Sequence, residues 1–185
     1  MRRYLLPILI ATSSLHSPAS LASETPQSFE SCSMITSEYL TVLQLMSRGF
    51  DEETLMADLP DISGPAQARL HSLYAMARTD GLGETYSRIN AEYARCAKGV
   101  YQSRGMPAAG TREAHFHACA GENKVRYDIT LAAVIGADPS EVRGQLAPQH
   151  RPVANALFDL YQAQGLTAVF DELASELKAC LNWQP

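Results

Sequence analysis

The chain has 185 residues, which is enough for one compact domain or two small ones. It carries 15 basic and 20 acidic residues, a formal net charge of −5, with a single Trp and no cluster of Lys and Arg. This composition argues against a nucleic-acid partner, because proteins that bind nucleic acid present a basic patch to the phosphate backbone.

Residues 1–22 have the features of an export signal. Arg2 and Arg3 form a short positive region, the segment 4–11 is apolar, and Ser20-Leu21-Ala22 resembles a signal-peptidase site. The apolar run is too short to span a bilayer, which takes about 20 residues. We therefore predict a cleaved signal peptide (1–22) and a periplasmic or secreted protein, of which we favour the periplasmic location, that has no membrane span after processing.

The segment 23–98 is predicted to form a first helical repeat. Its apolar residues recur at spacings of three and four, which is typical of amphipathic helices, and strand-like alternation is absent from the chain. One face of the first helix would carry Cys32, Ile35, Tyr39, Val42, Leu43 and Met46. Gly49 would end this helix, and Asp51 would cap a second, short one. Pro65 and Gly81 bound a third helix, and the fourth carries on one face Tyr86, Ile89, Tyr93 and Cys96.

Residues 99–113 are predicted to form a connector. Its middle, from Ser103 to Thr111, contains two glycines and a proline and has no helical period. A plain linker is one interpretation. The alternative is a binding loop, because loops on a rigid scaffold often carry binding residues. The residues of the types enriched at protein interfaces are Tyr101, Arg104, Met106 and Arg112.

Residues 114–185 repeat the pattern of the first segment. An offset of 87 aligns Cys119 with Cys32, and a three-residue deletion then changes the offset to 84, which aligns Cys180 with Cys96. The matched positions are turn formers, large apolar residues and cysteines, which are the types that a shared fold needs. Asp138, followed by a proline and a glutamate, gives a strong helix start. We predict an all-α protein with an internal repeat, a tandem duplication of a disulfide-stapled unit of about four helices.

The four cysteines indicate two disulfide bonds, because an exported chain folds in an oxidising compartment and the count is even. Three pairings are possible, and only a bond within each copy respects the duplication. We therefore predict Cys32–Cys96 and Cys119–Cys180. The long loops that these bonds close make each worth about 4 kcal/mol in the chain-entropy model.

The stretch from Glu113 to Cys119 contains a His-x-His pair and is the part that most resembles a metal or redox site. Cys119 aligns with Cys32, whose surroundings contain no ligand cluster, so a disulfide is the favoured role for Cys119. Histidines two apart on a helix point to different sides, so His115 and His117 would share an ion only in an extended segment. Solvated residues at a helix start are the favoured interpretation. The alternative function is a periplasmic metal or small-ligand carrier that uses Glu113, His115 and His117.

Catalytic motifs do not stand out in the chain. It has no Gly-x-Ser-x-Gly elbow, Gly-rich phosphate loop, His-Glu-x-x-His helix or Cys-x-x-Cys pair. Glu52 and Glu53 are adjacent carboxylates, but they fall in the first turn of a predicted helix, where the helix dipole favours acidic residues. We expect no enzymatic activity and no cofactor.

The second repeat is polar at two positions where the first is apolar. Glu122 aligns with Ile35, and Arg126 aligns with Tyr39. A solvated helix face is the default interpretation of such a change. The alternative is a recognition surface, in which the partner-binding residues would be Lys124, Arg126 and Tyr127.

In compartment, size and disulfide-linked helices (Cys32, Cys96, Cys119 and Cys180), the chain resembles the periplasmic all-helical immunity proteins that protect bacteria from peptidoglycan-amidase effectors of the type VI secretion system. No binding motif of that family can be matched, so no residue role is carried over. The resemblance implies a protein partner, an envelope hydrolase or toxin whose cleft is blocked. We expect an inhibitor or immunity protein that acts by protein–protein interaction, and a structural accessory of an envelope machine is a third possibility.

Overall fold

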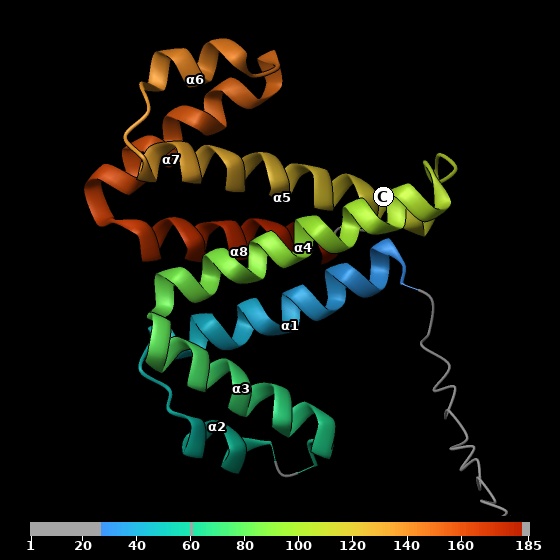
Figure 1. The fold of residues 1–185 in the computed structure, drawn as a ribbon, viewed down its shortest axis with the longest axis vertical. Helices are drawn as coiled ribbons and strands as arrows, with labels where there is room; N and C mark the ends of the chain where they lie inside the picture. The colour runs from blue at the N-terminus through green and yellow to red at the C-terminus, as the bar shows by residue number, and fades with distance from the viewer. Residues whose placement is uncertain (1–26, 60, 183–185) are drawn as a thin grey trace, which may run out of the picture.

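The computed structural model describes residues 27–59 and 61–182, so the predicted signal peptide lies outside the described residues. Within these ranges the regular structure is helical, without a β-strand, and the prediction of an all-α protein is confirmed (Figure 1). The helices are α1 (Phe29–Ser47), α2 (Glu52–Asp58), α3 (Gly64–Asp80), α4 (Leu82–Arg104), α5 (Arg112–Val134), α6 (Pro139–Gln145), the 3-10 helix η1 (Pro148–His150), α7 (Arg151–Gln164) and α8 (Leu166–Asn182). None of these described helices combines the length and apolarity needed to cross a membrane.

Four long helices form the centre of the molecule. Helices α1, α4, α5 and α8 all pack against one another. The pair α2 and α3 lies on one side of this centre, and the pair α6 and α7 lies on the opposite side (Figure 1). Both halves therefore have the same order of long and short helices, with α1 and α4 adjacent in the first half and α5 and α8 adjacent in the second.

Matching turns occur at matching places in the two halves. Gly49 has φ 90° and Gly136 has φ 73°, and each follows the end of a central helix in the left-handed region, where a side chain is strained. In both turns the glycine and the following residue donate back to the last helical turn, as in a Schellman motif. Asp51 caps α2 and Asp138 caps α6 through side-chain acceptors, as predicted. The duplication itself stays a prediction.

One hydrophobic cluster runs through both halves. Its largest fully buried side chains come from α1, α4, α5 and α8 and include Leu40, Leu43, Tyr86, Tyr93, Ile129, Val169, Phe170 and Leu173. A smaller cluster of Leu55, Leu70 and Tyr74 holds α2 against α3. The central core therefore depends on residues that are far apart in the sequence, while the side pair α2–α3 has local apolar contacts of its own.

Both predicted disulfides are confirmed. Cys32–Cys96 joins α1 to α4 across 64 residues, and Cys119–Cys180 joins α5 to α8 across 61 residues. Every cysteine is paired. Each bond lies within one half, so the two halves are held together by non-covalent contacts and by the single backbone connection between α4 and α5.

Two details differ from the predictions. Ile35, predicted to lie on the apolar face of the first helix, is 49% exposed, because the neighbours of α1 cover the face that carries Cys32, Leu40 and Leu43 instead. The connector is also shorter than predicted. Helix α4 continues through Ser103 and Arg104 and α5 begins at Arg112, which leaves residues 105–111 as the non-helical part.

Candidate functional site

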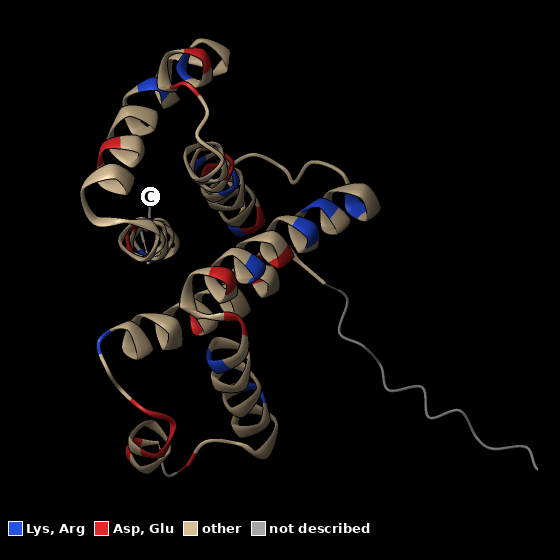
Figure 2. Ribbon diagram, turned by 60° about the vertical axis from the view of Figure 1, so that its left-hand side comes forward, with Lys and Arg blue, Asp and Glu red and all other residues tan. Residues whose placement is uncertain are grey.

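The connector loop, defined here as residues 105–111, joins the two longest helices. Gly105 ends α4 with φ 75°, and Thr111 caps α5 by accepting from the amide of Ala114. Met106 is 67% exposed in this loop, and Tyr101, one and a half turns earlier, is 47% exposed. Several Lys and Arg residues lie along α4 in the direction of the loop (Figure 2). This end of the molecule therefore presents apolar and basic side chains side by side.

Glu113 connects the two halves at this end. Its Oε2 accepts from the amide of Phe29 at 2.9 Å, and its Oε1 accepts from the amide of Glu30 at 3.4 Å. These amides are the first two of α1, which no carbonyl within the helix can reach. A carboxylate at a helix N-terminus also interacts favourably with the helix dipole. Glu113 is thus an N-terminal cap for a helix in the other half of the chain.

Arg112 also makes its contacts within the molecule. Its guanidinium donates to Glu30 Oε1 at 2.6 Å and lies 5.2 Å from the centre of the Phe116 ring. The hydrogen bond to Glu30 raises the pKa of Arg112. Although the side chain is 70% exposed, its charge is already matched by a carboxylate.

The two histidines of the suspected metal site have separate surroundings. His115 Nε2 lies 3.8 Å from Cys119 Sγ, one turn along α5. The His117 ring lies against Phe29 at a centroid distance of 4.7 Å and is stacked near Tyr101 at 6.1 Å. Since Glu113 caps α1, the proposed ligands Glu113, His115 and His117 do not gather around one point, and the described residues contain no group of three or more potential ligands that could hold a metal ion.

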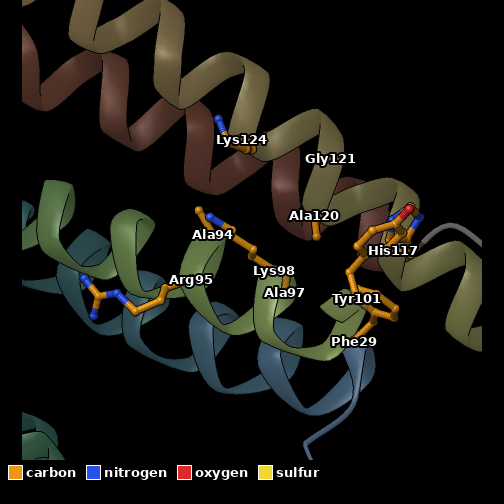
Figure 3. A pocket seen from close by; sticks show the side chains of 10 residues that line it. All are labelled: Phe29, Ala94, Arg95, Ala97, Lys98, Tyr101, His117, Ala120, Gly121 and Lys124. Carbon is orange, nitrogen blue, oxygen red and sulfur yellow. The ribbon is translucent and has the colours of Figure 1, made fainter. Parts of the chain in front are cut away.

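A groove runs between α4 and α5 next to the ends of these helices that the connector loop joins. It has a volume of about 500 Å³, and small residues leave it open: Ala94 and Ala97 on α4, and Ala120 and Gly121 on α5. An aromatic cluster borders one part of the groove, and three basic side chains border the other (Figure 3). We call this feature the α4–α5 groove, and its other lining residues are Phe29, Tyr101, His117, Arg95, Lys98 and Lys124.

The three cations of the groove differ in their partners. Arg95 pairs with Glu92, and Lys124 pairs with Asp128, in both cases between exposed side chains on the same helix. Lys98 forms no ion pair with any residue in the described part of the chain. Exposed ion pairs of this kind contribute about 0.2 to 1 kcal/mol, so Arg95 and Lys124 can readily exchange their carboxylate partners for another anion. The rim of the groove is therefore locally basic on a chain whose net charge is −5.

The remaining predicted partner contacts lie elsewhere. Tyr127 is only 8% exposed, and its hydroxyl lies 2.9 Å from Ser87 Oγ, so its assignment to a partner surface was wrong. The physical reason is that α5 is a central helix with neighbours on several sides, which covers the Tyr127 ring. Arg126 is 19% exposed and links α5 to α8 through Glu176 at 3.3 Å. Only Tyr101 and Lys124 of the predicted partner residues line the α4–α5 groove.

Glu52, one of the adjacent carboxylates in the sequence, joins α2 to α3. It accepts from His71 Nδ1 at 2.7 Å and from Arg78 at 3.1 Å. The hydrogen bond from His71 is the main reason that the pKa of Glu52 is lowered. These contacts give Glu52 a structural role, because they hold α2 against the next helix in the chain, α3.

The sequence interpretation missed Phe29, Arg95, Lys98 and the four small residues of the groove, and it named His117 only as an alternative metal ligand. A signal was present on one helix, because Ala94 and Ala97 are three residues apart and share a face; on the other helix the small residues Ala120 and Gly121 are adjacent. Small residues on two facing helices leave space between them. What the sequence did not reveal was that these two helices lie side by side.

No protein-family model matches the chain, and no curated protein or solved structure matches it either. The chemistry of the connector end and of the α4–α5 groove is therefore the basis for inferring function.

Proposed function

We propose that this chain is an exported, periplasmic inhibitor or immunity-type protein that neutralises an envelope-acting hydrolase or toxin. The partner contacts the connector loop and the adjoining ends of α4 and α5. The observation that carries the proposal is the exposure of Met106 on a short loop between two helices that are each fixed by a disulfide. A binding loop on a rigid support loses little conformational entropy when it enters a cleft.

Three contacts make the support of this loop rigid. Cys32–Cys96 fixes α4 to α1, and Cys119–Cys180 fixes α5 to α8. Glu113, two residues after the loop, accepts hydrogen bonds from the start of α1. The loop itself has only seven residues between two helix ends. Binding elements held in this way keep their geometry before the partner arrives, which favours inhibition by blocking a cleft.

The side chains at the connector end suit a cleft that is apolar inside and acidic at its rim. Met106 provides a flexible apolar side chain that adapts to an irregular pocket. Arg104 is an exposed cation that forms no ion pair within the described residues, so it is available to a carboxylate of the partner. A stable interface covers about 800 Å² on each partner, more than a seven-residue loop provides, so Tyr101 and the helix ends contribute as well.

The two disulfides support the exported location that this function needs. Bonds of this kind form and persist in oxidising compartments such as the periplasm. An envelope hydrolase or toxin acts in the same compartment, so inhibitor and partner would meet there.

The proposal is tested with purified, disulfide-bonded protein as bait against envelope extracts, followed by inhibition assays on the captured partner. Arg104→Glu and Met106→Ala should each weaken binding by about 10- to 100-fold, as truncation of central interface residues does. The matched control is Arg48→Glu, because Arg48 is also exposed and follows the last turn of a helix, but α1 ends there far from the connector loop.

The inhibition assay decides the function itself. With a captured hydrolase, wild-type protein should abolish hydrolysis of purified peptidoglycan at a one-to-one ratio, and Arg48→Glu should do the same. A captured protein whose activity is unaffected, or whose binding survives both connector substitutions, would overturn the proposal.

A further inference from the structure

The α4–α5 groove has two chemically different ends. At one end the rings of Phe29, Tyr101 and His117 lie together, with His117 in contact with both of the others. Toward the other end lie the nitrogen atoms of Arg95, Lys98 and Lys124 (Figure 3). The residues between them, on the floor of the groove, are the alanines and Gly121. A ligand that matches this arrangement is apolar at one end and negatively charged at the other.

The dimensions of the groove fit a narrow apolar chain. From Arg95 to Tyr101 the groove follows α4 over six residue steps, a length of roughly 9 Å at the rise of an α-helix. The space exists because the side chains at Ala97, Ala120 and Gly121 are short or absent. A volume of about 500 Å³ lies in the range of small-molecule sites.

We propose that the α4–α5 groove binds a monomeric single-chain carboxylic acid of the medium-chain fatty-acid class. The tail lies over the alanines and Gly121 with its end against the aromatic cluster, and the carboxylate lies among Arg95, Lys98 and Lys124. This inference goes beyond the proposed function and does not depend on it, because the ligand is a small molecule and its site is the groove below the connector loop.

The charges at the rim explain why the head group is an anion. Arg95 and Lys124 are each paired on the surface, with Glu92 and Asp128, and Lys98 adds a positive charge that no acidic side chain in the described ranges matches by an ion pair. A carboxylate placed between the two helices is attracted by all three cations. The surface around the groove belongs to an acidic chain, which repels anions elsewhere.

Gly121 offers a substitution that fills the groove without disturbing the fold. A Cβ added at Gly121 meets nothing within 4 Å, and the residue lies inside α5, where leucine is a better helix former than glycine. Gly121→Leu should therefore be at least as stable as the wild type and yet place a branched side chain in the path of the tail. The matched control is Gly99→Leu on α4, where an added Cβ is equally free and which does not line the groove.

Binding is measured by calorimetry with hexanoate, octanoate and decanoate below their micelle concentrations. Affinity should rise about fourfold for each methylene group that enters the groove. Gly121→Leu should abolish binding, while Gly99→Leu should bind as the wild type does. Lys98→Glu should weaken decanoate binding by about tenfold or more, since the charge at the head group is reversed.

Three results would overturn the proposal. One is equal affinity for decyltrimethylammonium, which has the same tail and a positive head. The second is decanoate binding that survives in Gly121→Leu. The third is a dimer in sedimentation that Gly121→Leu dissociates, because the groove would then be covered by a second copy of the chain.

Discussion

Glu113 allows a quantitative test of how the two halves are joined. The first amides of α1 have a complete set of acceptors: Ser31 donates to Ser28 Oγ at 3.0 Å, and the amides of Phe29 and Glu30 donate to Glu113. Glu113→Gln keeps the size of the side chain and one acceptor oxygen but removes the charge. It therefore removes the charge and one of the two acceptor oxygens of a cap that one half of the chain provides for the other.

The magnitude follows from two contributions. A carboxylate at a helix N-terminus contributes about 0.3 to 1 kcal/mol through the helix dipole. A hydrogen bond to a charged group exceeds a neutral one by about 1 kcal/mol. Glu113→Gln should thus lower the free energy of unfolding by about 1 to 2 kcal/mol, which corresponds to a decrease in Tm of about 3 to 6 °C for a domain of this size. Glu113→Ala should cost more, because the amides of Phe29 and Glu30 then lose both acceptor oxygens.

Urea unfolding of the disulfide-bonded protein, followed by circular dichroism, measures these differences from the midpoints at constant slope. Glu84→Gln is the matched control, because Glu84 also lies in the first turn of a helix but is exposed and caps no other helix among the described residues. Its change should stay within about 0.5 kcal/mol, as for surface substitutions in general. If Glu113→Gln proves no more destabilising than Glu84→Gln, the cap between the halves does not contribute to stability and the reasoning fails.

Three further predictions concern stability. Burial raises the pKa of Tyr93 to about 12 from an ordinary value of 10.0. The contribution of the neutral phenol to the free energy of unfolding is therefore complete below pH 10 and is lost as the pH rises towards 12, by about 2 to 3 kcal/mol in total. Tyr93→Phe should flatten the alkaline decline in urea midpoints, and parallel curves would contradict the assignment. Replacing Cys32 and Cys96 together by Ala should lower the free energy of unfolding by about 4 kcal/mol, measured by urea unfolding. Asn123 donates to Asn90 Oδ1 at 2.9 Å inside the core, so a double-mutant cycle with Ala at both positions should give a coupling of about 1 kcal/mol, and strict additivity would refute it.

The sequence was sufficient to predict a structural feature wherever the interactions that determine the feature are local. Asp51 and Asp138 cap helices through their own next turn, and Gly49 has the positive φ that its position requires. These features depend on a few neighbouring residues, so the sequence pattern predicts them directly. The disulfide pairing was predictable for another reason, namely that the repeat reduced three possibilities to one.

The errors at Ile35 and Tyr127 have a common cause. Both assignments assumed that the polarity of a helix face tells whether the helix is central or peripheral. Helix α5 carries many charged residues, yet it packs against α1, α4, α7 and α8, and its charges are accommodated by ion pairs such as Arg126 with Glu176. Helix α1 looks more apolar, but it leaves Ile35 half exposed. Tertiary neighbours, which periodicity does not identify, decide which face is covered.

Tertiary neighbours also decide the roles of Glu113, His115 and His117, the residues of the alternative metal site. Their types and spacing suggested ligands, but a residue type acquires its role from the groups that the fold places beside it. Glu113 lies beside amides 84 and 83 residues away, and His117 lies beside Phe29 from the other half. Neither contact has any signal in the local sequence.

The α4–α5 groove depends on both halves in a way that the disulfides do not. Helix α4 is bonded to α1, and α5 is bonded to α8, so neither bond sets the distance between α4 and α5. That distance is set by the shared core and by the cap that Glu113 gives to α1. Phe29, the first residue of α1, is both capped by Glu113 and part of the aromatic end of the groove. A substitution that weakens the cap is therefore expected to perturb the wall of the groove at Phe29.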